Sequence, residues 1–364
     1  MSPEADRRFM ALALGLARRG VGNVAPNPAV GCVIVKGSTI VGRGWTQPGG
    51  RPHAEVRAIA QAGAAAAGST AYVTLEPCAH HGATPPCASA LIAAGVSRVI
   101  SAATDPDPRV SGRGHAMLRA AGIEVVEGVL GAEARALNAG FFSRVTTGRP
   151  WLTLKLALTL DGRIATASGA SRWITGPEAR RAVHLMRAQH DAVMVGIGTA
   201  LADDPGLTVR DLGIVRQPVR IVVDSKLRLR PDSALVRTSA EVPVWLCHSA
   251  PARPMPGLHL IGCATGVDGR VDLADAMQRL GAAGLTRVLC EGGGTLAAGL
   301  IEAGLVDELV CISAGRVFGA GGAASVAALA GITLPRAPDF CVTDYRRVGG
   351  DILHRWRRSK PFTD

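Results

Sequence analysis

The sequence has few aromatic residues, few cysteines for its length and no long apolar run. Aromatic residues make up 4% of the 364 residues, which leaves few platforms on which single-stranded nucleic acid could stack. Eight cysteines are too sparse for a disulfide scaffold, so we expect reduced thiols, some of them metal ligands. No stretch reaches about 18 apolar residues without a charge or a breaker, so we expect no transmembrane helix. The acidic residues ahead of the first apolar run are not typical of a signal peptide, and we expect a cytoplasmic protein.

The chain is basic, but its charge is not concentrated. Lysine and arginine number 40 against 29 acidic residues, which gives a net charge of +11 that divides almost evenly between the two halves. Without a basic block or tail, a dedicated nucleic-acid surface is not indicated. An even basic surface fits either an arginine-rich proteome or small phosphorylated ligands. Hydrophobic residues at 48% are enough for a sizeable core, and the length suggests two domains.

Helices and strands are expected to alternate along both halves. The first half begins with a helix capped by Ser2 and ended by Gly20, and a hairpin follows. The alternation predicts an α/β fold with a partly parallel sheet. The polar residues 143–150 predict a linker between domains at 1–147 and 148–364. The other expected helices are 53–63, 86–95, 114–122 and 295–303, and the expected strands are 29–35, 39–42, 70–75, 98–102, 124–127, 151–158, 192–196, 220–224, 244–247, 287–291 and 308–313.

The strongest motif in the first half combines His53-Ala54-Glu55 with a later Pro77-Cys78 and Cys87. An H-x-E followed by P-C and a second cysteine is typical of zinc-dependent nucleobase deaminases. Such an enzyme needs three protein ligands and one open position, and one imidazole with two thiolates supplies the three. His53 and Cys87 are each expected at a helix start, where free N–H groups favour a thiolate. We therefore predict zinc bound by His53, Cys78 and Cys87.

Glu55 is predicted to be catalytic rather than a ligand. Two residues after the histidine, it would take the proton of the attacking water and deliver it to the ring nitrogen and the leaving amine. The same three ligands could also hold a structural zinc ion in a binding protein. A structural site has no use for a free carboxylate beside an open position, so Glu55 favours the enzyme. The remaining cysteines lie in apolar surroundings and are expected as core thiols: Cys32, Cys247, Cys263, Cys290, Cys311 and Cys341.

Eight residues separate Cys78 from Cys87, where nucleobase deaminases commonly have two. This longer motif, P-C-x-H-x-G-x-T-P-P-C, resembles that of the deaminase of riboflavin biosynthesis, and every fixed position of it is filled. Segments 26–31 and 105–114 match the same family. The resemblance implies a cytidine-deaminase-like three-layer α/β/α domain in which Asn27, His80 and Asp105 contact the substrate; His81 is expected at the surface. The even charge and the long spacing argue against the alternative of a deaminase acting on tRNA or free nucleosides.

The second half contains a glycine-rich turn, Gly292-Gly293-Gly294, between an expected strand and helix. Backbone N–H groups at such a turn can hold a pyrophosphate. A Rossmann domain is disfavoured, because its fingerprint belongs to the first βα turn and this one lies late. Taken alone, this half indicates no more than a nucleotide-type α/β domain.

The second half resembles the reductase domain of the same bifunctional family, whose fold is similar to dihydrofolate reductase. The resemblance implies NADPH as cofactor, with one group of residues lining its site and a second holding substrate. Lys155 and Asp203 are candidates for polar assistance at the sugar, and a purely structural ion-pair role is an open alternative for both. The cofactor residues are Ala157, Trp173, Thr199, Asp203, Ser225, Gly293, Gly294, Thr295 and Gly299, and the substrate residues are Lys155, Ser171, Arg187, Leu207, Arg210 and Glu291.

The resemblance therefore implies two reactions of riboflavin biosynthesis. The first is zinc-dependent hydrolytic deamination of 2,5-diamino-6-(5-phosphoribosylamino)pyrimidin-4-one. The second is NADPH-dependent reduction of the ribosyl chain to give 5-amino-6-(5-phosphoribitylamino)uracil. We expect a phosphorylated pyrimidine as the partner, neither nucleic acid nor membrane, and a homo-oligomer formed through the reductase domain.

Overall fold

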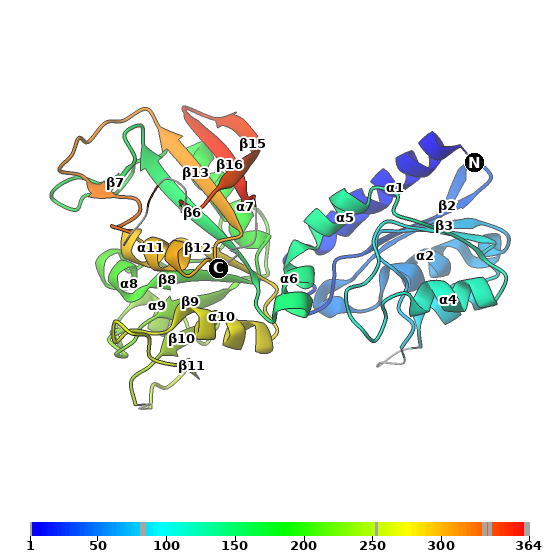
Figure 1. Cartoon of the computed structure of the whole chain (residues 1–364), viewed down its shortest axis with the longest axis horizontal. Coiled ribbons are helices and arrows are strands. Elements are labelled where there is room, and N and C mark those ends of the chain that lie inside the picture. The colour runs from blue at the N-terminus through cyan, green and yellow to red at the C-terminus, as the bar shows by residue number, and fades with distance from the viewer. Residues whose placement is uncertain (1, 81–84, 252–253, 330–332, 334–336, 360–364) are drawn as a thin grey trace. The chain divides into compact units, whose positions relative to one another are not determined.

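The computed structural model describes residues 2–80, 85–251, 254–329, 333 and 337–359. The chain folds as two compact units, Met1–Gly148 and Arg149–Asp364, and each is described by itself (Figure 1). No helix among the described residues is long and apolar enough to cross a membrane.

The first unit is built on a five-stranded sheet in the order β2-β1-β3-β4-β5. Strand β1 is antiparallel to β2 and β3, whereas β3, β4 and β5 run parallel. Helices α1 and α5 lie on one side of the sheet and α2 and α4 on the other (Figure 1). The strands are β1 Gly31–Lys36, β2 Thr39–Trp45, β3 Thr70–Val73, β4 Arg98–Ser101 and β5 Glu124–Glu127, and the helices are α1 Pro3–Ala17, α2 Ala54–Ala62, α3 Cys87–Ala93, α4 Arg113–Ala120, α5 Gly131–Leu137 and α6 Ala139–Thr147.

Two glycines of β2 bring helix α2 directly onto the sheet. A Cβ atom at Gly42 would lie 2.2 Å from the Ala58 carbonyl oxygen, and one at Gly44 would lie 2.1 Å from that of Ala54. Only glycine permits this approach, because backbone stands where a side chain would be. The start of α2, which carries His53 and Glu55, is therefore held at a fixed height over the sheet.

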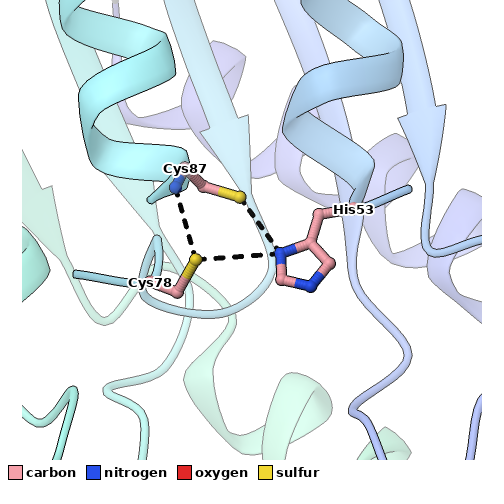
Figure 2. A group of neighbouring side chains, drawn as sticks. All are labelled: His53, Cys78 and Cys87. Carbon is pink, nitrogen blue, oxygen red and sulfur yellow. Dashed lines mark hydrogen bonds between the residues drawn. The ribbon is translucent and has the colours of Figure 1, made fainter. Parts of the chain in front are cut away.

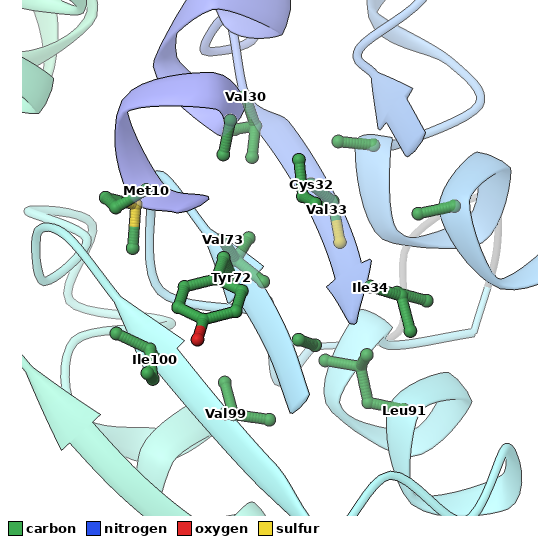
Figure 3. Close-up of a cluster of buried hydrophobic side chains, with 14 of the residues drawn as sticks. Met10, Val30, Cys32, Val33, Ile34, Tyr72, Val73, Leu91, Val99 and Ile100 are labelled. Carbon is green, nitrogen blue, oxygen red and sulfur yellow. The ribbon is translucent and has the colours of Figure 1, made fainter. Parts of the chain in front are cut away.

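Buried side chains from both faces of this sheet form the core of the first unit. Met10 of α1, Ile34 of β1, Tyr72 of β3 and Leu91 of α3 are all fully buried (Figure 3). The Tyr72 hydroxyl donates a hydrogen bond of 2.7 Å to Asp6 in α1. This bond satisfies the one polar atom that Tyr72 brings into the core.

The second unit is built on a nine-stranded sheet in the order β11-β10-β9-β8-β12-β6-β13-β16-β15. All neighbours are parallel except the antiparallel pairs that β16 forms with β13 and β15. The strands are β6 Trp151–Thr159, β8 Ala192–Gly196, β9 Val219–Val223, β10 Val244–His248, β11 His259–Gly262, β12 Arg287–Cys290, β13 Glu308–Ala314, β15 Phe340–Val348 and β16 Asp351–Arg358, with β7 Arg163–Ala165 and β14 Ala323–Ala324 as a separate pair; the helices are α7 Pro177–Ala188, α8 Ile197–Asp203, α9 Ala234–Arg237, α10 Leu273–Ala282 and α11 Gly294–Glu302.

The expected helices and strands are present, with ends that differ by a few residues. The expected linker at residues 143–150 is wrong in its first part, because α6 continues to Thr147. The Thr146 and Thr147 hydroxyls donate to the helix's own carbonyls of Phe142 and Ser143, so these polar residues support the helix instead of interrupting it. The helix ends where Gly148 adopts a φ of 76°.

Two of the six cysteines expected in the core are not fully buried. Cys341 is exposed, because it lies on β15 at the edge of the nine-stranded sheet, and Cys263 is half-buried just after β11. The other four, Cys32, Cys247, Cys290 and Cys311, are buried as expected. Helices α5 to α10, strands β7, β11 and β14, and the hairpin of β15 and β16 were not predicted from the sequence.

Candidate functional sites

Three predicted ligands meet at one end of the first unit's sheet. His53 immediately precedes α2, Cys78 lies in the loop after β3, and Cys87 is the first residue of α3. Their ligand atoms all lie within 4.8 Å of one another (Figure 2). His53 Nδ1 is 3.1 Å from Cys87 Sγ and 3.7 Å from Cys78 Sγ, and the Cys87 N–H donates to Cys78 Sγ at 3.3 Å.

These distances and atom types fit a zinc ion. Tetrahedral zinc with one imidazole and two thiolates places nitrogen and sulfur roughly 3.5 Å apart, given Zn–N and Zn–S bonds of about 2.0 and 2.3 Å. The hydrogen bonds from Cys87, together with the nearby His53, lower the pKa of Cys78 to about 4, which favours the thiolate that binds metal. Among the described residues, three ligands come together, which leaves a fourth position open as in catalytic rather than structural zinc sites.

Glu55 lies beside this cluster, in the first turn of α2, and only 4% of its surface is exposed. Burial raises the pKa of Glu55 to about 6, and the neighbouring His53 opposes that rise. Its carboxylate lies within hydrogen-bonding reach of Cys87. A buried carboxylate next to an open metal position can take a proton and return it.

The three residues predicted to contact the pyrimidine lie on separate loops. The amide of Asn27 lies against Gly50, where a Cβ would fall 1.9 Å from Asn27 Nδ2 and where φ is 86°. His80 is half-buried, and its Nδ1 has no hydrogen-bond partner among the described residues. Asp105 is buried, and burial raises its pKa to about 6, although the hydrogen bond from the Asp107 N–H opposes that rise. Residues 81–84 of the motif, which include His81, lie outside the described residues.

In the second unit, three predicted residues form one buried ion-pair cluster. Glu291, which follows β12, accepts hydrogen bonds of 2.6 and 3.0 Å from Arg187 of α7. Lys155 of β6 approaches the same carboxylate at 3.8 Å. Burial alone would raise the pKa of Glu291, but the two cations outweigh it and bring that pKa to about 2. Burial lowers the pKa of Lys155.

The remaining residues of this unit that were predicted to bind substrate are Leu207, Arg210 and Ser171. Arg187 also donates to the Thr208 carbonyl at 2.9 Å, next to Leu207, which is buried with a φ of 53°. Arg210 is exposed and Ser171 half-buried, and within the described residues neither side chain bonds to the cluster. His184 was not predicted; its Nδ1 lies 3.1 Å from the Thr208 carbonyl oxygen, and burial together with the charges of Arg187 and Arg210 lowers its pKa.

The predicted cofactor residues gather at the carboxyl ends of parallel strands. Ala157 lies near the end of β6, Thr199 follows β8, Ser225 follows β9, and Gly293 follows β12. Ligands of open α/β sheets bind at this edge.

Thr199 and the turn after β12 are in direct contact. The Gly293 N–H donates to Thr199 Oγ1 at 3.2 Å, just where α11 begins and presents its free N–H groups. Ser225 Oγ instead accepts a hydrogen bond from the Val271 N–H, and the Asp203 carbonyl accepts one from Arg172. Trp173 is 61% exposed, with Arg180 stacked 4.7 Å from its ring. A glycine turn, a helix start and an exposed aromatic side chain fit a dinucleotide.

Comparison with known proteins assigns both units. Residues 3–103 match the family described as the cytidine and deoxycytidylate deaminase zinc-binding region, and residues 150–352 match the RibD C-terminal domain. The riboflavin biosynthesis protein RibD of Escherichia coli (strain K12) is 46% identical over 96% of this chain and 98% of its own length. The chain belongs to the RibD family.

Solved RibD structures share the fold over nearly the whole chain. Acinetobacter baumannii RibD superimposes with a TM-score of 0.90 at 38% identity, covering 99% of this chain and 100% of its own. A deaminase/reductase from Thermotoga maritima gives a TM-score of 0.88 at 34% identity, covering 98% and 99%. This RibD chain is a bifunctional deaminase and reductase of riboflavin biosynthesis. The predicted fold class, the two activities and the zinc and NADPH cofactors are confirmed; the roles of single residues stay predictions.

Glu76 was not singled out from the sequence, although it directly precedes the Pro77-Cys78 of the motif. Its side chain is buried and accepts four backbone hydrogen bonds from residues 105–115. An acidic residue at the end of an apolar strand, next to a metal ligand, was the available signal.

Proposed function

We propose that the first unit deaminates 2,5-diamino-6-(5-phosphoribosylamino)pyrimidin-4-one and that the second reduces the ribosyl chain of the product. The observation that carries the proposal is the cluster of His53, Cys78 and Cys87 with buried Glu55 beside it. The related Thermotoga maritima protein is described as a diaminohydroxyphosphoribosylaminopyrimidine deaminase and 5-amino-6-(5-phosphoribosylamino)uracil reductase. The same substrates are proposed for this chain, because the two proteins are 34% identical and share the fold over 98% of this chain.

In the deaminase site, each residue has a separate task. His53, Cys78 and Cys87 would hold zinc, which supplies Lewis-acid activation of the attacking water. Glu55 takes one proton of that water and passes it to the ring nitrogen, then takes the second proton of the same oxygen and passes it to the leaving amine. Asn27, His80 and Asp105 orient the pyrimidine and its ribose. The unpartnered Nδ1 of His80 supports a ligand contact there, since buried polar atoms are normally paired.

In the reductase site, the ion-pair cluster holds the sugar. Bound NADPH supplies the hydride. Glu291 accepts hydrogen bonds from ribose hydroxyls, while Lys155 donates to the oxygen at the carbon being reduced. Arg187 already donates to Glu291 and Thr208, so its main task is to fix Glu291. That leaves exposed Arg210 as the contact for the substrate phosphate, with Ser171 and Leu207 completing the pocket.

The cofactor itself is proposed to lie along the carboxyl edge of β6, β8, β9 and β12. Backbone N–H groups at the start of α11 face its phosphates, and the Thr199 hydroxyl holds that turn in place. Trp173, whose ring is exposed, would supply an aromatic surface for the cofactor. The full set of residues in this proposal is Ala157, Trp173, Thr199, Asp203, Ser225, Gly293, Gly294, Thr295 and Gly299.

We further propose a homo-oligomer formed by a second copy through the reductase unit, acting in the cytoplasm, where thiol ligands stay reduced. Strand β15 lies at one edge of the nine-stranded sheet and is exposed along most of its length; Tyr345 is 78% exposed. An open edge strand is a natural surface for pairing with another copy. Sedimentation should show an oligomer that Tyr345→Glu dissociates and that Val215→Glu, at another exposed site, leaves intact. A monomeric wild type would contradict the proposed homo-oligomer.

The two activities are tested together with purified, zinc-loaded protein and the diaminopyrimidinone phosphate. Ammonia release should come first, and NADPH oxidation should follow it. Ammonia without NADPH oxidation would contradict the reductase assignment, and no ammonia at all would contradict the deaminase assignment. Cytidine and a tRNA serve as control substrates, and preferential turnover of either would favour the alternative nucleobase deaminase.

A further inference from the structure

Glu76 is a buried carboxylate whose two oxygens are both engaged by backbone donors. Oε2 accepts hydrogen bonds from the N–H groups of Asp105 at 3.2 Å and Gly112 at 3.0 Å. Oε1 accepts from Gly114 at 2.9 Å and from His115 at 3.4 Å. Four donors compensate the cost of burying this charge, and all of them come from one segment 29 to 39 residues further along the chain.

The two donors on Oε2 are the two ends of a loop. Asp105 and Gly112 bracket the segment 105–112, in which Asp105 is the residue expected to contact the substrate. Oε2 of Glu76 therefore binds both ends of the loop. Within the loop, the Asp105 side chain accepts from the Asp107 N–H at 2.8 Å, and Asp107 pairs with Arg109.

The two donors on Oε1 are free N–H groups at the start of helix α4. This helix has Gly112 as its N-cap, which offers no side-chain oxygen. The Glu76 carboxylate takes the place of a cap, and its negative charge faces the positive end of the helix. The same side chain thus fixes the loop and the helix that follows it.

The backbone of Glu76 leads directly to the metal cluster. Glu76 N–H donates to the Ala103 carbonyl at 2.8 Å, and two residues later the Cys78 carbonyl accepts from the Ala88 N–H of α3. The start of α4 touches this same stretch, because a Cβ at Gly114 would lie 1.9 Å from the Pro77 carbonyl oxygen. Loop 105–112 and ligand Cys78 are therefore held to one another through a single residue.

We propose that Glu76 is a positioning residue for deamination, which fixes loop 105–112 against Cys78 so that Asp105 meets the bound pyrimidine. The inference rests on the proposed function of the first unit, since it assumes that Asp105 binds the substrate. Glu76 itself touches no substrate. Its four hydrogen bonds set the position of Asp105 relative to the metal cluster.

Glu76→Gln removes this function while it keeps the size of the side chain. One amide oxygen can still accept from two N–H groups, but the amide NH₂ turns donors toward the other two. Either the loop ends or the helix start must then move. A displacement of about 1 Å at an orienting group costs roughly 10²-fold in rate.

The test compares Glu76→Gln with Glu127→Gln in the full chain. Glu127 is a matched control, since it also contacts His115, at 3.0 Å, but does not bind the loop. Glu76→Gln should raise KM for the pyrimidine and lower kcat/KM for deamination by about 10²-fold, with zinc retained and reduction of pre-deaminated substrate unchanged. Glu127→Gln should match wild type, and Glu76→Asp, which keeps the carboxylate, should recover part of the loss.

A purely structural role would give a different pattern. Partial unfolding lowers the active fraction, so the apparent kcat would fall together with zinc content while KM stayed constant, and that result overturns the proposal. An unchanged KM with full zinc overturns it as well. Failure of the wild type to release ammonia would contradict the proposed function instead, so the two outcomes are distinct.

Hydrogen exchange on the wild-type protein supplies a test that needs no variant. The amides of Asp105 and Gly112 lie at the ends of a surface loop but should exchange as slowly as that of Gly114, because all three donate to one buried carboxylate. Fast exchange at Asp105 and Gly112 beside slow exchange at Gly114 would show that the loop is not pinned, and the proposal would fall.

Discussion

Replacing Glu291 with glutamine should destabilise the second unit by about 3 kcal/mol at neutral pH. In the wild type, one carboxylate compensates two buried cations: Arg187 donates two hydrogen bonds to it, and Lys155 approaches at 3.8 Å. Glutamine keeps the volume but leaves Lys155 and Arg187 facing each other without an anion. Breaking a buried ion cluster by removing one partner typically costs about 3–5 kcal/mol.

The pKa of Glu291 gives a second value for the same interaction. It falls from 4.5 to about 2 on folding, because the two neighbouring cations outweigh the effect of burial. Such a fall corresponds to roughly 3 kcal/mol. The value agrees with the range expected for a broken buried pair.

The same pKa sets the pH dependence and its sign. A carboxyl group whose pKa is depressed on folding contributes stability above its unfolded pKa and loses it as the pH falls toward the folded value. The contribution of Glu291 is therefore complete above pH 4.5 and declines between about pH 4.5 and 2. At about pH 3.5, roughly 1 kcal/mol of it should be gone.

Tryptophan fluorescence can follow the second unit by itself. Four of the five tryptophans, Trp151, Trp173, Trp245 and Trp356, lie in this unit, so a Trp45→Phe background removes the remaining one. Urea unfolding of this background with and without Glu291→Gln, at neutral pH and at about pH 3.5, gives both differences in free energy. Equal stability at neutral pH, or a difference that does not shrink on acidification, would refute the reasoning.

Three further predictions concern the two sites. Purified protein should hold about one zinc per chain, and Cys78→Ser or Cys87→Ser should lose it and destabilise the first unit; full occupancy in both variants, by elemental analysis, would mean that the ligands are misassigned. Glu55→Gln should lower ammonia release roughly 10²–10⁴-fold, because an amide cannot carry a proton, while reduction of pre-deaminated substrate continues; loss of both activities would contradict independent sites. Arg210→Ala should raise KM for reduction and leave deamination unchanged, since it removes a phosphate contact; an unchanged KM would place the phosphate elsewhere.

The metal cluster could be predicted from the sequence because its determinants are local. His53 and Glu55 lie two residues apart, and Cys78 and Cys87 lie in one short motif. His53 and Cys87 each sit at a helix start that a preceding proline marks in advance. Only the joining of His53 to the cysteines depends on the fold, and the deaminase-like motif supplied that step.

Glu76 escaped prediction because its role depends on contacts that no local pattern records. A single glutamate before a proline has many structural uses, and its four donors lie 29 to 39 residues away. The same holds for the polar residues at 143–147. Their hydroxyls indicated a linker. However, the partly buried Phe141 and Phe142 pack against the core, and this packing stabilises the segment as a helix.

The ion-pair cluster of the second unit was predicted only in part. Arg187 and Glu291 were assigned to the substrate by resemblance, and Lys155 was a candidate for polar assistance with an ion-pair role as the alternative; that these three residues pair with one another was not predicted. The pairing follows from topology: β12 lies beside β6, and α7 follows β7 and leads into β8 on the other side of β12. Parallel strands that are neighbours in space but more than 130 residues apart in sequence bring Lys155 and Glu291 together. Arg187 is already hydrogen-bonded to Glu291, whereas Arg210 is exposed, so we propose Arg210 as the phosphate contact; the sequence spacing of the two arginines does not reveal this difference in burial.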